Sequence, residues 1–282
     1  MVRTRDTIFR LIYKLILSDM VAISSLQKNT SAYVNEWVAW HLSLGFDKIF
    51  IHDNSEKGNI GDYIQEEYKD KVVIVPIEKD EGQCVCDLQT QVINDFIQAH
   101  SEDVDWCAFI DSDEYIHIDN YSSVQEWLSN APQDVNCVAL NWHLYGDDGV
   151  IEGDETQPVQ ERFTHCINDV FERNGTCLGN MSKKILRLNK DIVAEDMFIY
   201  KVDNEKMPMY DCNFVNIGGC SVVMAVDCSS YQCYINHYVT KSLSECVKYK
   251  CSDLWGMRTF EDYYFTFNER TAEKEAYIRE KL

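Results

Sequence analysis

Positive charge is scarce in this chain. It has 26 Lys and Arg residues against 47 Asp and Glu, which gives a formal net charge of −21 at pH 7. Nucleic acids and anionic membranes bind basic patches, so this balance argues against both as principal partners. It does not exclude a small anionic substrate, because charges more than about 8 Å apart are largely screened at physiological salt. A protein this acidic that binds a diphosphate is expected to recruit a cation.

Several sequence motifs of known metal and nucleotide sites are also missing. The 12 cysteines include no C-x-x-C pair, and the spacings of Cys84 with Cys86 and of Cys246 with Cys251 do not suit zinc. There is no glycine-rich dinucleotide fingerprint, no P-loop and no internal repeat. A reduced, cytoplasmic location is favoured over a Golgi or secretory one. Four Asn-x-Ser/Thr sites keep the secretory alternative open.

No apolar run is long enough to cross a bilayer. The longest candidate, Ile8 to Leu17, is interrupted by Arg10 and Lys14, which lie four residues apart on one helical face. We therefore predict an amphipathic helix over residues 1–19 that packs on the body of the protein. Packing on a partner subunit or contact with a membrane surface is left open.

Apolar segments of strand length alternate with helical patterns along the first half of the chain. Strands are predicted over 20–26, 48–52, 72–77 and 106–110, and helices over 32–44 (capped by Ser31), 60–68 and 88–99. This alternation is typical of a mostly parallel sheet with helices on both faces. Residues 119–282 are less regular, with a helix near 124–128, a strand over 137–142 and a charged, helical C-terminus. No linker separates 20–118 from 119–282, so we expect one compact α/β unit.

The most informative stretch is W-C-A-F-I-D-S-D-E-Y-I-H-I, which runs from Trp106 to Ile118. Asp111 and Asp113 end an apolar strand and project to the same side, because side chains alternate along an extended chain. Two carboxylates there suit Mg²⁺ or Mn²⁺ with positions open for phosphate oxygens. Lys28-Asn29 and Asp53 also follow strands, and ligands of parallel sheets bind beyond the carboxyl ends of strands. We therefore expect a site at this edge of the sheet.

Four motifs in order carry a family resemblance. They are K-N-T-S-A-Y-V-N-E-W-V-A-W-H-L-S-L-G-F-D (28–47), I-F-I-H-D-N-S (49–55), W-C-A-F-I-D-S-D-E-Y-I (106–116) and I-N-H-Y-V-T-K-S (235–242). Over residues 21–250 the chain resembles GT-A-fold glycosyltransferases related to families 2 and 92, the DUF23-like group. The resemblance implies a GT-A fold, a Rossmann-like, mostly parallel sheet flanked by helices. Residues 20–118 would bind the nucleotide sugar, and 119–282 would form a mixed acceptor-binding half.

The resemblance also implies a reaction: transfer of a sugar from a nucleotide-diphosphate donor, here a UDP-sugar, to a glycan hydroxyl, with inversion and with Mn²⁺ or Mg²⁺ as cofactor. The metal ligands it implies are Asp111, Asp113 and His237. The donor-binding residues it implies are Lys28, Asn29, Asp53, Gln89, Asn94, Asp111, Lys183, His237, Lys241 and Ser242.

Departure of a diphosphate builds negative charge, which a cation with His237 and Lys241 would stabilise. The acceptor hydroxyl benefits from a general base, and Asp148, Glu161 and Asp147 are candidates that the sequence does not rank. A sugar-1-phosphate nucleotidyltransferase is one alternative, although the glycine-rich loop of such enzymes is absent after the first strand. A non-catalytic carbohydrate-binding protein is the other.

Overall fold

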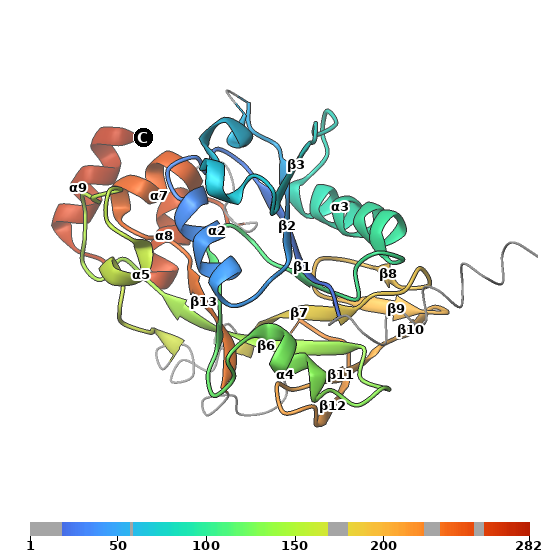
Figure 1. The fold of residues 1–282 in the computed structure, drawn as a ribbon. Coiled ribbons are helices and arrows are strands. Elements are labelled where there is room, and N and C mark those ends of the chain that lie inside the picture. Colours follow the sequence, from blue (N-terminus) through green and yellow to red (C-terminus); the bar gives the residue numbers. More distant parts are fainter. Residues whose placement is uncertain (1–18, 57–58, 169–179, 223–231, 251–256) are drawn as a thin grey trace, which may run out of the picture.

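A ten-stranded mixed sheet forms the centre of the molecule (Figure 1). The computed structural model describes residues 19–56, 59–168, 180–222, 232–250 and 257–282. The helix predicted over residues 1–19 falls almost entirely outside these ranges. The strand order is β12-β11-β6-β7-β4-β1-β2-β3, and β13 pairs with both β5 and β6. Mixed α/β architecture is thereby confirmed.

The first four strands form the parallel half of the sheet. They are β1 (Val21–Gln27), β2 (Lys48–Asp53), β3 (Val72–Pro76) and β4 (Trp106–Phe109). In register, Gln27 lies beside Asp53, and Ser24 lies beside Phe109. The carboxyl ends of β1, β2 and β4 therefore meet at one edge, as the sequence predicted.

The remaining strands close the sheet in a mixed pattern. They are β5 (Glu114–Ile118), β6 (Cys137–Tyr145), β7 (Ser182–Arg187), β11 (Pro208–Tyr210), β12 (Asn216–Gly219) and β13 (Cys233–Tyr238). Strand β7 runs antiparallel to β4 and β6, whereas β13 is antiparallel to β5 and parallel to β6. This register sets His237 opposite Glu114, directly after the D-x-D segment. A small separate sheet holds β8 (Val193–Ala194), β9 (Tyr200–Val202) and β10 (Glu205–Lys206).

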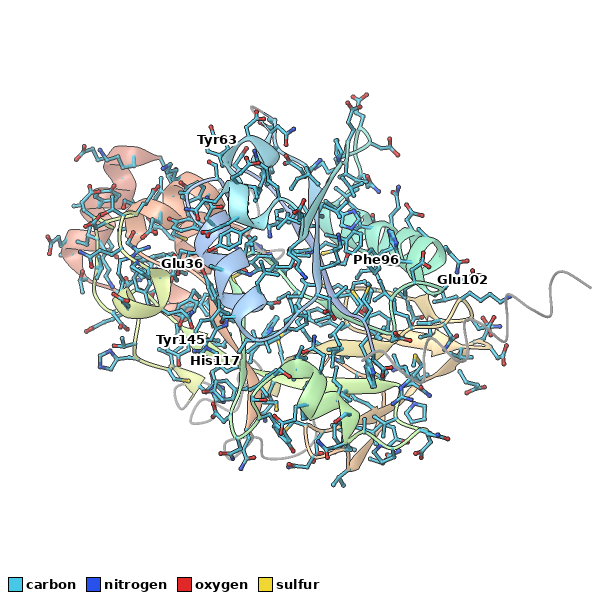
Figure 2. The ribbon with its side chains drawn as sticks, in the orientation of Figure 1. Glu36, Tyr63, Phe96, Glu102, His117 and Tyr145 are labelled. Carbon is cyan, nitrogen blue, oxygen red and sulfur yellow. The ribbon has the colours of Figure 1, made fainter. Side chains whose placement is uncertain are left out.

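Helices cover both faces of the parallel half (Figure 1). Helix α2 (Val34–Ser43) lies on one face and α3 (Val85–His100) on the other. Further helices lie elsewhere in the fold: α4 (Val124–Ser129), α5 (Val159–Arg162), α7 (Leu243–Lys250), α8 (Phe260–Phe267) and α9 (Ala272–Lys281). Alternate strand residues feed two cores: Val21 and Ile23 pack in the core that contains Trp37 of α2, and Ala22 packs in the core that contains Phe96 of α3. Figure 2 shows Glu36 of α2 and Phe96 on opposite sides of the strands.

Two local predictions are wrong. The helix predicted over 60–68 is a pair of 3₁₀ turns, η1 (Ile60–Tyr63) and η2 (Glu66–Tyr68), because Ile64 and Gln65 between them are extended. Ser31 does not cap α2. The helix begins after Tyr33, whose side chain makes no capping bond, and the Thr30 carbonyl accepts the N–H groups of Tyr33 and Val34. Among the described residues, no helix is long and apolar enough to cross a membrane.

Candidate functional site

Motifs that are far apart in the sequence meet beyond the end of β4. Asp111 follows β4, Asp113 precedes β5, and His237 of β13 lies in register beside β5. Lys183 of β7 and Gln89 of α3 complete the group from neighbouring elements. The antiparallel pairing of β7 with β4 explains why a residue 72 positions away reaches the D-x-D segment.

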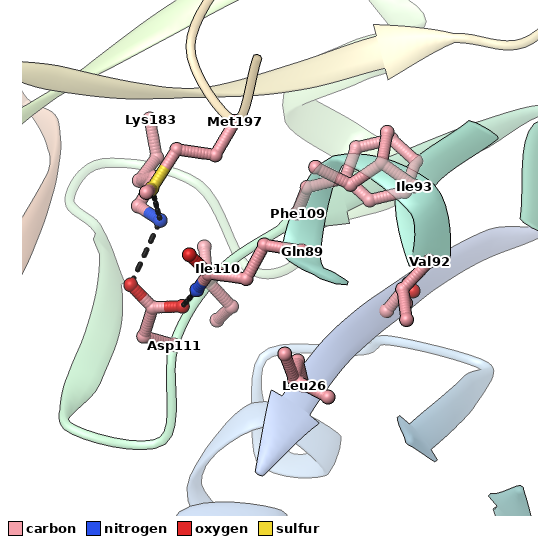
Figure 3. A pocket seen from close by; sticks show the side chains of 10 residues that line it. Leu26, Gln89, Val92, Ile93, Phe109, Ile110, Asp111, Lys183 and Met197 are labelled. Carbon is pink, nitrogen blue, oxygen red and sulfur yellow. Dashed lines mark hydrogen bonds and ion pairs between the residues drawn. The ribbon is translucent and has the colours of Figure 1, made fainter. Parts of the chain in front are cut away.

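Asp111 is held by two side chains (Figure 3). Gln89 Nε2 donates to Oδ1 at 2.8 Å, and Lys183 Nζ donates to Oδ2 at 2.8 Å. The backbone N–H of Asp111 donates to Glu114 Oε2 at 2.8 Å. The Asp111 side chain is still 28% exposed, whereas that of Lys183 is 3% exposed. Lys183 is therefore a buried ammonium that presents a partly exposed carboxylate at the edge of a narrow cavity.

Asp113 is buried between two basic groups. Lys250 Nζ, from the last residue of α7, lies 2.7 Å from Oδ2, and His237 Nε2 lies 3.6 Å from Oδ1. Burial alone would raise the pKa of the Asp113 carboxyl, but Lys250 and His237 outweigh it and hold that pKa well below its usual range. The Asp113 carbonyl also accepts the backbone N–H of Tyr238 at 2.9 Å. Asp113 is thus ionised and fixed on both its side chain and its backbone.

Glu114 is the third carboxyl group of this segment, and its environment differs. It is fully buried, and burial raises its pKa to about 8, although Lys183 Nζ at 4.0 Å opposes the rise. Asp111 and Asp113 raise that pKa further. Glu114 therefore holds its proton more tightly than an ordinary glutamate, while its Oε2 accepts the Asp111 N–H.

These side chains do not, as they lie, fit a divalent cation. In the described part of the chain, no group of three or more His, Cys, Asp or Glu residues is arranged to hold a metal ion. The two carboxylates that would be the main ligands already face the ammonium groups of Lys183 and Lys250. A protein site for Mg²⁺ or Mn²⁺ uses oxygen ligands that are free to face the ion. Binding of Mn²⁺ or Mg²⁺ by Asp111, Asp113 and His237 stays a prediction.

A cleft of about 440 Å³ opens beyond the ends of β1 and β2. Its lining includes Asn29, Ser55 and Tyr63 on one side and Lys248 and Tyr249 of α7 on the other. Tyr63 is exposed, and Figure 2 shows it near the turns that follow β2. A cleft with two aromatic rings and several hydroxyl and amide groups has the size and chemistry to take a nucleoside.

Asp53 holds two residues of the cleft lining, Ser55 and Ile60, in place. Its Oδ1 accepts the backbone N–H of Ser55 at 2.9 Å, and its Oδ2 accepts that of Ile60 at 2.8 Å. Asp53 ends β2, two strands from β4, which corresponds to roughly 10 Å at the usual strand spacing. Lys28 pairs with Glu56 at 2.6 Å, and the Asn29 N–H donates to Ser55 Oγ. The structure thus brings Asp53, Lys28 and Asn29 to one loop cluster, and their contact with a donor stays a prediction.

Lys241 and Ser242 lie at the start of α7. Lys241 is buried, has a positive φ of 55°, and its Nζ lies 5.1 Å from the centre of the Tyr33 ring. Burial lowers the pKa of Lys241, which the nearby Asp113 charge opposes. Ser242 Oγ donates to Glu245 Oε2, one turn later in the helix. Phosphate contact by these two residues stays a prediction, and Ser242 has a clear structural partner.

Two predicted residues have other partners in the structure. The Asn94 amide donates to the carbonyls of Thr90 and Ala194 and accepts the Ala194 N–H, which fastens β8 to α3. Asp147 is buried, its Oδ2 lies 2.6 Å from Lys274 Nζ and also accepts the Tyr264 hydroxyl, and its Oδ1 accepts the Gly149 N–H. Both side chains join separate elements of the fold. Donor binding by Asn94 and base catalysis by Asp147 stay predictions.

The other two base candidates differ in exposure. Asp148 has a positive φ of 47°, and its Oδ2 accepts the Thr164 N–H at 2.7 Å and lies 3.1 Å from His165 Nδ1. Glu161 is exposed on α5. Which of these carboxylates is the general base stays a prediction.

Sequence analysis missed Lys250, Glu114 and Glu245. Glu114 was visible beside the D-x-D, but its burial depends on β13, which arrives 120 residues later. Glu245 accepts both Arg162 amino groups, at 2.8 and 3.0 Å, and the hydroxyls of Tyr33 and Ser242. Lys250 stands in an ordinary charged helix, and no local pattern marks it.

Comparison with known proteins supplies one relationship. No family model matches the chain. A glycosyltransferase family 92 protein of Ricinus communis is 25% identical over 139 residues, which make up 46% of this chain and 23% of that protein. Over this segment the chain is similar to a family 92 glycosyltransferase. It spans about a quarter of the length of this curated relative, so the relative's whole activity is not transferred to it.

A solved structure, the bifunctional glycosyltransferase WbbM in its apo form, matches 45% of this chain and 24% of its own at 12% identity. Its TM-score of 0.30 is too low to carry an argument. The relationship to glycosyltransferases therefore rests on the curated relative.

Proposed function

We propose that this chain is a GT-A glycosyltransferase that moves a sugar from a UDP-sugar to a glycan hydroxyl with inversion. The observation that carries the proposal is the meeting of Asp111, Asp113, Lys183 and His237 at the sheet edge that also bears a nucleoside-sized cleft. The relationship to family 92 glycosyltransferases supports the same reaction class.

The cleft would take the nucleoside. Tyr249 and Tyr63 offer ring faces, and the Asn29 and Ser55 side chains offer polar contacts to base or ribose. Asp53 keeps this wall in place through its two backbone hydrogen bonds. The donor diphosphate would then extend toward Asp111, where buried Lys183 supplies positive charge.

Transfer breaks the bond between the anomeric carbon and the β-phosphate oxygen, and the electron pair leaves with that oxygen. Positive groups fixed around the diphosphate stabilise this charge most when their orientation is set in advance. Lys183 and Lys250 are held by carboxylates in this way. A carboxylate near the acceptor takes the hydroxyl proton, and Asp148 or Glu161 would have this role.

The first experiment is a thermal-shift panel of UDP-, GDP- and CMP-sugars. A donor at a hundredfold excess over its dissociation constant stabilises a protein by about 2.7 kcal/mol. UDP-sugars are expected to shift the wild-type protein, and the selected donor then enters a transfer assay. If no nucleotide sugar stabilises the folded protein, the proposal is wrong.

Asp113→Ala is expected to reduce transfer by about 10² to 10³, the usual cost of losing one fixed electrostatic group. The physical reason is that Lys250 and His237 both depend on this carboxylate for their positions. Release of UDP from the selected donor is the measurement. Asp134→Ala, an exposed residue of the loop before β6, is the matched control and should keep full activity. Equal turnover by the two variants would remove Asp113 from the mechanism.

A further inference from the structure

We propose that the ammonium groups of Lys250 and Lys183 take the place of a divalent cation at the D-x-D, so that this site binds diphosphate without metal. The inference rests on the proposed function for its ligand. It differs from the Mn²⁺ or Mg²⁺ dependence that the family resemblance implies.

Each carboxylate of the D-x-D has its own lysine. Lys183 Nζ lies 2.8 Å from Asp111 Oδ2, and Lys250 Nζ lies 2.7 Å from Asp113 Oδ2. The two lysines arrive from β7 and α7, which approach the segment from different parts of the fold. The negative charge that would attract a divalent ion is therefore already balanced.

The burial of Asp113 strengthens this argument. Its side chain is 3% exposed and lies between Lys250 and His237. A cation that used Asp113 would first have to displace the Lys250 ammonium, which leaves a second positive charge beside the ion. Like charges at such distances repel strongly where water is excluded. The arrangement favours the lysine over the metal.

Lys250 is also placed to meet a ligand. Its side chain remains 24% exposed although its Nζ contacts a buried carboxylate. An ammonium group has three donors, so the contact with Asp113 leaves donors for phosphate oxygens. Two residues earlier, Lys248 lines the nucleoside-sized cleft, so the same helix borders both parts of the donor site.

The chemistry balances without metal. The acceptor oxygen forms the new bond to the anomeric carbon, and its proton passes to a carboxylate base. The old bond breaks at the β-phosphate oxygen, which leaves as part of a nucleoside diphosphate with one more negative charge. Lys250 and Lys183 neutralise that charge, and the leaving group needs no proton.

Binding of Mn²⁺ without nucleotide tests the lysine claim by itself. Electron paramagnetic resonance of free Mn²⁺ is measured with wild type, Lys250→Met, and Lys250→Met combined with Asp113→Asn. Removal of the ammonium should raise Mn²⁺ affinity by at least about tenfold, and the added Asp113→Asn change should abolish the gain. Lys201→Met is the control. It removes a lysine of β9 that pairs with Glu195, and it should bind Mn²⁺ like wild type.

The inference would be overturned if the wild-type protein bound Mn²⁺ as tightly as Lys250→Met does, and if the Asp113→Asn change abolished this binding. Circular dichroism and urea unfolding establish that each variant is folded. If Lys250→Met does not fold, Lys250→Gln replaces it, because glutamine keeps a polar group near Asp113 without the charge.

Calorimetry of UDP then tests the consequence for the donor. Wild-type affinity should be the same with EDTA and with Mn²⁺, whereas Lys250→Met should lose about tenfold in EDTA and regain it with Mn²⁺. A tenfold loss for wild type in EDTA would overturn the inference. If UDP binds none of the proteins, the proposed function fails, and the Mn²⁺ measurement still decides whether lysine holds the carboxylates.

Discussion

Among single residues, several buried or partly buried carboxylates each pair with a particular basic side chain. Asp111 and Asp113 face lysines at the proposed donor site. Asp147 faces Lys274, and Glu245 faces Arg162. Sequence showed the acidic residues but not these partners, because every pair joins positions more than 70 residues apart. The basic partners are scarce in a chain of net charge −21, and the fold places several of them beside buried carboxylates.

Glu245 gives a prediction about stability. Its side chain is 2% exposed and that of Arg162 is 7% exposed, and the pair is bidentate. Glu245→Gln leaves a buried guanidinium without its counter-charge, which typically costs about 3–5 kcal/mol. Urea unfolding at pH 7 is the measurement. Glu275→Gln, at an exposed pair with Arg270, is the control and should cost less than about 1 kcal/mol. Equal losses of unfolding free energy for both variants would show that the buried pair stabilises the fold no more than the exposed pair.

At the scale of elements, helix α2 fixes the segment that carries the D-x-D. Trp37 Nε1 donates to the Glu114 carbonyl at 2.8 Å, and Trp40 Nε1 donates to the Ile116 carbonyl at 2.7 Å. His41 Nε2 accepts the Ile116 N–H at 3.2 Å. The aromatic residues of the 28–47 motif thus hydrogen-bond to the backbone of the 106–116 motif. This explains why the aromatic residues of the first motif accompany the acidic one.

Trp37→Phe tests this link. Loss of the indole N–H leaves the buried Glu114 carbonyl without this donor, which costs about 1–3 kcal/mol. The matched control is Trp127→Phe, because Trp127 is equally buried and donates to the Cys212 carbonyl at 3.0 Å, outside the proposed donor site. Both variants should lose similar stability in urea, and only Trp37→Phe should lose UDP affinity. Unchanged affinity in Trp37→Phe would contradict a role for α2 in holding the site.

Elements of the parallel half were predictable because their signals are local. Strands β1 to β4 and helix α3 appear within about three residues of their predicted positions, since apolar runs and helical spacing report burial directly. The turns η1 and η2 were missed because their extended joint depends on a tertiary contact, the Gln65 N–H donated to Asn35 Oδ1. In the site, the family resemblance predicted that Asp113 and His237 lie together. The position of Lys250 beside Asp113 could be seen only in the folded structure.

At the scale of the whole molecule, buried neutral histidines set the response to acid. Burial lowers the pKa of His41 to about 3 and of His52 to about 4. Below the unfolded value of about 6.5, the unfolded chain binds protons that the folded chain does not. Stability is therefore complete above about pH 6.5 and falls as the pH approaches 4, by about 2 kcal/mol per histidine at pH 5.

Urea unfolding at pH 7.5 and pH 5 checks this. His52→Asn should reduce the difference between the two conditions, because the contribution of His52 is then lost. The exposed His165, 84% accessible in its side chain, gives the control His165→Asn, which should leave the difference unchanged. Stability that is the same at both pH values in the wild type would contradict the burial of these rings as neutral groups.

The molecule as a whole combines a strongly acidic chain with a local basic cluster at one sheet edge. The cytoplasmic location favoured by the cysteine pattern stays a prediction, as do inversion and the donor sugar. Product analysis is the sharpest test of the proposed reaction. With the selected UDP-sugar and a glycan acceptor, we expect UDP and glycosylated acceptor in equal amounts. Release of pyrophosphate, or no product from any nucleotide sugar with folded protein, would show that the proposed reaction is wrong.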